Sequence, residues 1–288
     1  MITASLVKEL REKTGVAMME CKNALKETEG DIDAAIKILR ERGNAKAEKK
    51  ASRDANEGVI VAALDESGKS GVLVEVNCET DFVAKNENFQ AFVAEVANTV
   101  LASDVADVDA AMALPKDDVT LEQFIKSKVL EMGENLKFRR FERLTLDGEG
   151  VVASYIHLGG KVGVLIEVSA GKAETASAEA FKDLVKDLTL HIAATSPAGL
   201  KREDIPAELV ESEKDIFRKQ MEGAGKPADI LEKIIEGKLG KFYSERCLLE
   251  QGFVKDPDTT VKALLESKSK ELGDTISVNN FLRFGLGE

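Results

Sequence analysis

The sequence predicts an α+β protein: a helical N-terminal module followed by a duplicated core, each copy of which holds a small antiparallel sheet covered by helices. Three observations lead to this class. Apolar residues recur at helical spacing near the N-terminus. Two stretches of the middle of the chain repeat each other at a constant distance. A further helical segment interrupts the second copy.

Residues 1–45 are expected to form a three-helix bundle. The expected boundaries are a first helix that ends at Thr14-Gly15, a second over Ala17–Thr28, and a third that follows the N-cap Asp31 and ends before Gly43. Residues 46–56 are too polar to pack against a core, so they are predicted to be a linker.

The core is predicted from an internal repeat. The sequence G-V-I-V-A-A-L-D-E-S-G-K-S-G-V-L-V-E-V from Gly58 matches G-V-V-A-S-Y-I-H-L-G-G-K-V-G-V-L-I-E-V from Gly150, without a gap and 92 residues apart. The match resumes 140 residues apart, where Thr120–Glu134 corresponds to Thr260–Asp274, so the second copy is 48 residues longer. Each copy is predicted to hold two strands joined by a glycine-containing turn, two helices and a third strand.

The additional residues of the second copy are predicted to form an antiparallel helical hairpin. Two helical stretches within residues 195–258 are separated only by G-A-G-K-P, Gly223–Pro227, and proline suits the first turn of the second helix. The core then consists of subdomain 1, residues 57–146, and subdomain 2, residues 147–194 and 259–288.

Composition restricts the classes of function. A formal net charge of −12 disfavours a general nucleic-acid binder, because phosphate repels it. Three widely spaced cysteines argue against a disulfide framework and favour a reducing compartment. There is no apolar run of membrane-spanning length, and the N-terminus lacks the pattern of a signal peptide. We expect a cytoplasmic protein that does not contact membranes and whose partner is a protein or a small molecule.

The sequence contains no recognisable catalytic or metal-binding pattern. The only two histidines are His157 and His191, and no Cys/His spacing suits a metal site. No nucleophile motif is present, and G-A-G-K-P does not fit a phosphate-binding loop. His191 is expected on a core or partly exposed helix and His157 in an exposed hairpin turn. We therefore expect no enzyme activity, no metal and no cofactor.

The stretch E-V-N-C-E-T-D-F-V-A-K-N, Glu75–Asn86, places Phe82 beside Asp81 at the point where a strand ends. In a structural interpretation, Asp81 caps the next helix and Phe82 packs that helix onto the core. In a functional interpretation, T-D-F-V forms a protruding loop. The equivalent stretch of the second copy, Ser169–Ala176, lacks the motif although its flanking elements are retained. This missing symmetry favours the functional interpretation.

Two other features could contribute contacts. The basic run L-K-F-R-R-F-E-R, Leu136–Arg143, weakly suggests RNA contact, but its copy, Ile276–Arg283, has lost most of the charge. A solvated face of an edge strand is the favoured interpretation. Met18 and Met19 cannot both face a small core, so at least one is expected to be an exposed apolar contact.

Leu6–Leu25, L-V-K-E-L-R-E-K-T-G-V-A-M-M-E-C-K-N-A-L, and Glu75–Asn86 resemble the two sequence signatures of bacterial translation elongation factor Ts. The resemblance extends over essentially the whole chain in the same order. It implies that residues 1–45 form a ubiquitin-associated-like bundle that docks on the GTPase domain of elongation factor Tu. Some members of the family continue into a further helix beyond the point at which this sequence stops, Gly285–Glu288.

The resemblance also implies residue roles in guanine nucleotide exchange. The loop that displaces Mg²⁺ is matched by Thr80, Asp81, Phe82 and Val83, with Phe82 as its wedge. Contact positions of the N-terminal module are matched by Arg11, Met18 and Met19. A histidine near the loop contact is matched by His157. Such a factor would bind GDP-bound elongation factor Tu, promote GDP release and stay bound until GTP binds, and a 2:2 complex is left open. The alternative is a scaffold that binds through its N-terminal module alone.

Overall fold

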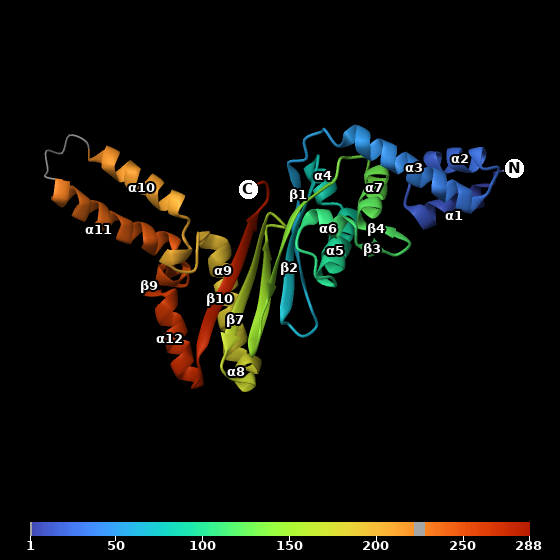
Figure 1. Ribbon diagram of the computed structural model, residues 1–288. Coiled ribbons are helices and arrows are strands. Elements are labelled where there is room, and N and C mark those ends of the chain that lie inside the picture. Colours follow the sequence, from blue (N-terminus) through green and yellow to red (C-terminus); the bar gives the residue numbers. More distant parts are fainter. Residues whose placement is uncertain (1, 222–227) are drawn as a thin grey trace.

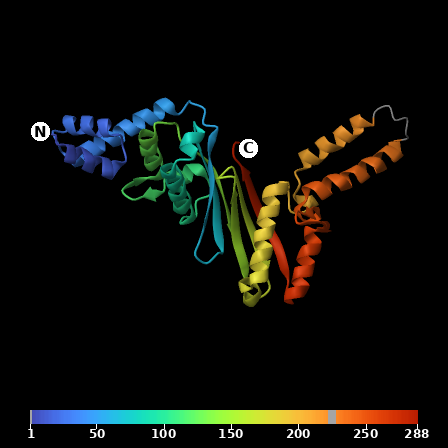
Figure 2. The ribbon, with the colours of Figure 1, turned by 180° about the vertical axis from the view of Figure 1, so that it is seen from behind.

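The computed structural model describes residues 2–221 and 228–288. A core of two facing sheets occupies the middle of an elongated molecule, a helical module lies at the N-terminal end, and a helical hairpin extends from the opposite side (Figures 1 and 2). This arrangement confirms the predicted α+β class and the order of its parts.

The N-terminal module has the three predicted helices: α1 (Ala4–Thr14), α2 (Met18–Glu27) and α3 (Ile32–Lys50). Gly15, at φ 67°, follows α1 and donates its N–H to the carbonyl of Arg11. The Asp31 side chain accepts the N–H of Ala34 and caps α3. The core of the module is apolar and consists of Val7, Leu10, Val16, Cys21, Ala24, Leu25, Ala35, Leu39 and Leu130, the last of which belongs to α7 (Leu121–Met132).

The prediction that the third helix ends before Gly43 is wrong, because α3 continues to Lys50. Gly43 is buried where α3 crosses α7, and a Cβ added there would lie 3.4 Å from the carbonyl oxygen of Lys126. Gly43 therefore lies at a contact between two helices rather than at the end of one. The predicted linker, residues 46–56, is consequently helical up to Lys50, and α3 extends from the N-terminal module to the core (Figure 1).

The two copies of the repeat form two antiparallel sheets with the same topology. The first has the order β1 (Glu57–Leu64), β2 (Ser70–Cys78) and β5 (Lys137–Thr145), and the second has β6 (Gly150–His157), β7 (Val162–Ala170) and β10 (Ile276–Gly285), with β7 in the centre. The irregularities of register are repeated too: Arg139 in β5 and Asn279 in β10, 140 residues apart, have no partner on the central strand. The duplication inferred from sequence is therefore structural.

The core has four layers, with helices outside and the two sheets facing each other between them (Figure 1). Helices α5 (Glu87–Leu101) and α7 cover the first sheet, and α9 (Glu179–Thr195) and α12 (Val261–Leu272) cover the second. The facing sheets approach closely at Gly71 and Gly163, the same position of the repeat. A Cβ added at Gly163 would lie 2.5 Å from Ile60 Cγ2, so only glycine permits this approach without rearrangement.

Gly58 and Gly150, which begin the two copies, are expected to be essential for stability. Their φ angles are 145° and 132°, and an added Cβ would clash with the carbonyl oxygen of Val76 or Val168. We expect Gly150→Ala to lower the free energy of unfolding by more than about 2 kcal/mol in urea titrations, since strained backbone and steric overlap add. Gly148→Ala is the control, because Gly148 also has a positive φ, 88°, but open space around it. Equal losses in the two variants would contradict this explanation.

The insertion forms the predicted hairpin of α10 (Ala207–Gln220) and α11 (Ala228–Arg246). Ile205, Ile235, Leu239, Phe242 and Cys247 form its buried apolar cluster. The predicted turn, Gly223–Pro227, lies outside the described residues.

The remaining short elements are α4 (Asp81–Ala84), α6 (Val108–Met112), β3 (Pro115–Lys116), β4 (Val119–Thr120), α8 (Ala173–Ser177), η1 (Arg202–Asp204), η2 (Leu248–Glu250), β8 (Gly252–Phe253) and β9 (Asp256–Thr260). Within the described ranges, no helix is long and apolar enough to cross a membrane.

Candidate functional site

The T-D-F-V motif forms a single helical turn, α4, between the central strand β2 and helix α5. Thr80 caps this turn, because its Oγ1 accepts the N–H of Val83 at 3.3 Å. Asn86 then caps α5 by accepting the N–H of Asn88 at 2.8 Å. The structural interpretation of Asp81 as the cap is therefore wrong.

Phe82 points away from the core and is 83% exposed, more than any other large apolar side chain in the described residues. One turn of helix can face the core on only one side, and Val83 and Ala84 occupy that side against the apolar core of subdomain 1. The interpretation that Phe82 packs the helix onto the core is wrong. A phenylalanine in this position gains burial only when another molecule covers it.

Asp81 places a negative charge next to this exposed ring. Its carboxylate pairs with the Lys85 ammonium group at 2.6 Å on the same turn. The hydrogen bond from Lys85 lowers the pKa of Asp81, and the more distant charge of Lys161 adds to the effect. Asp81 is therefore ionised at neutral pH, and the loop presents an exposed aromatic ring beside a carboxylate.

The turn between β6 and β7 brings subdomain 2 to the same edge of the molecule. The N–H of Ile60 in β1 donates to the carbonyl of Gly160 at 2.8 Å, and Lys161 pairs with Glu57 at 2.5 Å. Glu57 is the strand partner of Cys78, the last residue before the loop. His157 is exposed at the start of this turn, and its Nδ1 lies 2.8 Å from Tyr155 Oη. The structure thus places the predicted His157 on the face that carries the loop.

Arg11, Met18 and Met19 lie on the separate N-terminal module, at the far end of α3 from the loop (Figure 1). All three are exposed, and the exposed fractions of Met18 and Met19 are 51% and 62%. The prediction that at least one methionine is exposed is confirmed. The structure does not join these residues to Phe82 in one site, so the chain exposes apolar side chains at two separate places.

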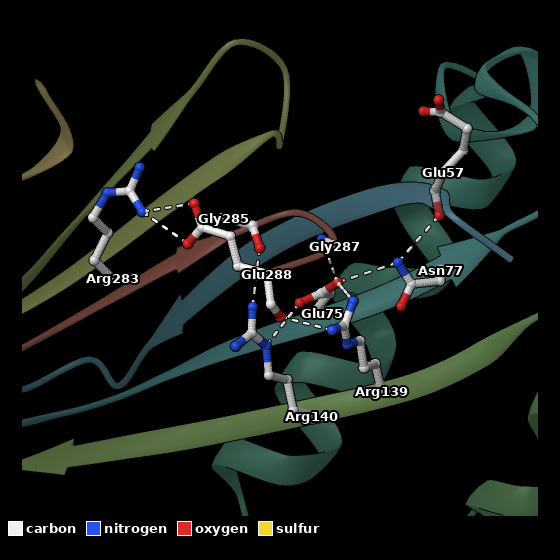
Figure 3. Close-up of polar contacts among 9 residues, drawn as sticks. All are labelled: Glu57, Glu75, Asn77, Arg139, Arg140, Arg283, Gly285, Gly287 and Glu288. Atoms are coloured by element: carbon white, nitrogen blue, oxygen red, sulfur yellow. Dashed lines mark hydrogen bonds and ion pairs between the residues drawn. The ribbon is translucent and has the colours of Figure 1, made fainter. Parts of the chain in front are cut away.

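The arginines of the basic run make contacts within the protein. Arg140 Nε donates to Glu75 Oε2 at 2.7 Å and Arg139 Nη1 to Oε1 at 3.3 Å, and the Glu75 side chain is 0% exposed (Figure 3). Arg143 Nη2 donates to the carbonyl of Val100, in the last turn of α5, at 2.7 Å. These side chains are half-buried, so the predicted solvated face is only partly correct. The arrangement favours a structural role for the run over contact with RNA.

Glu75 also joins the two subdomains. Gly287, beyond the end of β10, donates its N–H to Glu75 Oε1 at 3.2 Å, while Arg140 Nη2 donates to the carbonyl of Gly285 at 3.0 Å (Figure 3). Asn77 Nδ2 lies 3.2 Å from the same carboxylate oxygen. The buried carboxylate therefore ties the segment after β10 to the strand that leads into the loop.

His191 is structural. It is fully buried, its Nε2 lies 2.9 Å from Gln251 Oε1, and its Nδ1 accepts the N–H of Val254 at 3.1 Å. Burial lowers the pKa of His191, so the imidazole is neutral at physiological pH. In the part of the chain that the structure describes, no three His, Cys, Asp or Glu residues come together as a metal-binding group.

Sequence reasoning missed two residues, Glu134 and Asn135, that hydrogen-bond to the start of the loop from the segment between α7 and β5. The contact joins positions 54 to 56 residues apart, which no local pattern reveals. The repeat held one signal: an acid follows the glycine at the end of the equivalent helices, as Gly133-Glu134 and Gly273-Asp274.

Cys78, at the base of the loop, is expected to be chemically inert in the folded protein. It is buried, its Sγ donates to the carbonyl of Thr80 at 3.2 Å, and burial raises the pKa of the thiol to about 12. Because the thiolate is the reactive form, we expect alkylation of Cys78 by iodoacetamide at pH 8 to be on the order of 10³-fold slower than in urea. Peptide mass spectrometry distinguishes Cys78 from Cys21 and Cys247. Similar rates in the native and unfolded chains would contradict the buried anchor.

Comparison with known proteins identifies the family of the chain. A family model described as "Elongation factor TS" matches residues 79–288. The elongation factor Ts of Trichlorobacter lovleyi is 47% identical over 290 residues, which cover 100% of this chain and 93% of that protein. The proteins of the same name from Nitratiruptor sp. and Methylococcus capsulatus are 46% and 47% identical, and the matches cover 100% of this chain and 93% and 92% of those proteins. The chain therefore belongs to the elongation factor Ts family of translation elongation factors.

Proposed function

We propose that this protein is a cytoplasmic guanine nucleotide exchange factor that binds GDP-bound elongation factor Tu, displaces Mg²⁺ by inserting the Thr80–Val83 loop, and stays bound until GTP binds. Membership of the family implies interaction with elongation factor Tu. The observation that carries the mechanism is Phe82, an aromatic side chain 83% exposed on a helical turn that directly follows the central strand β2.

The chemistry of a GTPase site explains how such a loop could act. Mg²⁺ bridges nucleotide phosphates and protein oxygens, so the ion and GDP stabilise each other's binding. A partner that moves the GTPase side chains around the ion weakens the binding of both Mg²⁺ and GDP without covalent chemistry. In this proposal the Phe82 ring occupies space inside the GTPase, and Asp81, which is ionised, disturbs or orients charge near the ion.

The separation of contact surfaces fits the energetics of exchange. Binding of the exchange protein and binding of GDP are thermodynamically linked. The exchange protein therefore lowers the affinity of elongation factor Tu for GDP by the same ratio by which GDP lowers its affinity for the exchange protein. Since about 1.4 kcal/mol corresponds to tenfold, acceleration by several orders of magnitude needs more contact than one ring supplies. Met18 and Met19, together with Arg11, would dock the N-terminal module on the GTPase domain, and His157 would contact the partner beside the loop.

The test is stopped-flow release of a fluorescent GDP analogue from elongation factor Tu, measured over a range of concentrations of the full chain. We expect a saturating acceleration that depends on free Mg²⁺. Absence of acceleration, with binding to elongation factor Tu retained, would contradict the exchange function and favour a scaffold that acts through the N-terminal module. Sedimentation of the complex distinguishes a 1:1 from a 2:2 assembly.

A further inference from the structure

A single carboxylate holds the first part of the loop. Glu134 Oε2 accepts the backbone N–H groups of Glu79 and Thr80, both at 3.0 Å, and Oε1 accepts the Thr80 hydroxyl at 2.6 Å. That hydroxyl oxygen also accepts the N–H of Val83 and so caps the turn that carries Phe82. Hydrogen bonds to an ionised acceptor are stronger than neutral ones. Only the Thr80 side chain separates the Glu134 carboxylate from the helical turn of the wedge.

Glu134 is itself held in place from two directions. It follows Gly133, which ends α7 at φ 76°, and the next residue, Asn135, donates its N–H to Glu79 Oε1 at 2.6 Å. Asn135 Nδ2 donates to the carbonyl of Arg53, just after α3, at 2.8 Å. The segments around Glu79 and Glu134 thus exchange hydrogen bonds in both directions. Glu134 is half-buried, so its three bonds to the loop are partly shielded from water.

The second copy of the repeat has an acidic residue at the same position, but its loop carries no aromatic ring. Asp274, 140 residues after Glu134, follows Gly273, which ends α12 at φ 61°. Its carboxylate lies against the equivalent loop, since a Cβ added at Gly171 would clash with Asp274 Oδ1. The hydroxyl of Thr175, and also the backbone N–H groups of Thr275 and Lys172, lower the pKa of Asp274. The residue equivalent to Phe82 is Glu174, so this loop presents no aromatic ring.

We propose that Glu134 is a positioning residue for nucleotide exchange: its carboxylate fixes the Thr80–Val83 loop in the projecting conformation before the partner is bound. The proposal rests on the exchange function proposed above. A loop that is already ordered avoids the cost of ordering at the moment of insertion, and a loop that is competent only part of the time acts in proportion to that fraction. Glu134 acts through Thr80 and does not itself contact the partner.

The repeat supplies a matched control, Asp274→Ala, for the variant Glu134→Ala. Hydrogen exchange of the unbound full-length chain is the direct readout. We expect the amides of Glu79, Thr80 and Val83, which donate to Glu134 or to the Thr80 hydroxyl, to exchange at least about tenfold faster in Glu134→Ala and to be unchanged in Asp274→Ala. Glu134→Gln retains a carbonyl oxygen that can accept the two N–H bonds, so we expect it to recover part of the protection.

Stopped-flow GDP release then separates positioning from general damage. We expect the maximal rate at saturating factor to fall about tenfold in Glu134→Ala and less than about twofold in Asp274→Ala, with intermediate loss in Glu134→Gln. The half-saturating concentration should change less than about twofold in all three, because the N-terminal module still docks. Loss of active protein would raise the apparent half-saturating concentration instead.

Two outcomes overturn the role of Glu134: unchanged amide protection at Glu79, Thr80 and Val83 in Glu134→Ala, or a loss of maximal rate no greater than that of Asp274→Ala. The unmodified chain reports separately on the exchange function. If it does not accelerate GDP release, the exchange function fails, whatever the variants do. If it does so and Glu134→Ala matches it, only the positioning role fails.

Discussion

Phe82→Ala is expected to slow the maximal release of GDP from elongation factor Tu about 30- to 140-fold, because burial of a phenylalanine contributes about 2–3 kcal/mol and about 1.4 kcal/mol corresponds to tenfold. The side chain is 83% exposed in the free chain, so its removal leaves no cavity. We therefore expect the free energy of unfolding to change by less than about 0.5 kcal/mol. Stopped-flow kinetics and urea titration of the same preparation measure both quantities.

The control is Leu64→Ala, which removes an exposed apolar side chain at the opposite end of β1 and should leave the rate of exchange unchanged. Chelation of Mg²⁺ tests the mechanism further. If the wedge acts by displacing Mg²⁺, the loss of release rate in Phe82→Ala should become smaller when EDTA has already removed the ion. A defect of the same size with and without EDTA would show that Phe82 acts on GDP by another route, and normal exchange by Phe82→Ala would exclude the wedge.

Glu75→Ala is expected to lower the free energy of unfolding of the core by about 2–4 kcal/mol, because removal of one member of a buried ion pair takes the charged acceptor away from its partners. Four groups lose this acceptor: the side chains of Arg139, Arg140 and Asn77 and the N–H of Gly287. Each of the three side chains keeps a backbone carbonyl as a second acceptor. The two guanidinium groups are about one-third exposed and recover some hydration, which places the expected loss toward the lower end of the range. Urea titration followed by circular dichroism measures it.

Glu167→Ala is the matched control for this prediction. Glu167 occupies the same position of the second repeat and is half-buried, and its side chain accepts the neutral amide of Asn279 at 2.9 Å. Loss of one neutral hydrogen bond at a half-exposed position should cost about 1 kcal/mol or less. If Glu167→Ala destabilises the protein as much as Glu75→Ala does, the Glu75 network does not hold the two subdomains together.

The duplicated core was predictable because its signals are local and occur twice. Constant spacing of glycine and apolar residues identified two strand pairs with equivalent ends, and the structure shows them with the same strand order and the same register shift. Helix ends such as Gly15 and the cap at Asp31 were predicted for the same reason, since capping depends on a few adjacent residues.

Gly43 shows where such reasoning fails. In sequence Gly43 resembles Gly15, because both follow helical stretches. Gly15 ends its helix, whereas Gly43 lies inside α3. The difference comes from α7, more than 70 residues later, whose backbone approaches Gly43 closely. Packing against a distant helix stabilises the continued helix, and helix propensity alone cannot report that contact.

The sequence by itself determined that T-D-F-V is a special motif, because a fold that exists in two copies does without it in one of them. It favoured a protruding loop but could not show which side chains of the motif face the core. That depended on Val83 and Ala84, which take the core side of a single turn and leave Phe82 in solvent. Nor could it supply Glu75 and Glu134, since each bonds to groups brought near it only when the chain folds. Helices, strands and their ends depend on neighbouring residues and can be predicted from the sequence. The positions of Phe82, Glu75 and Glu134 depend on contacts between residues far apart in the chain, which only the folded structure shows.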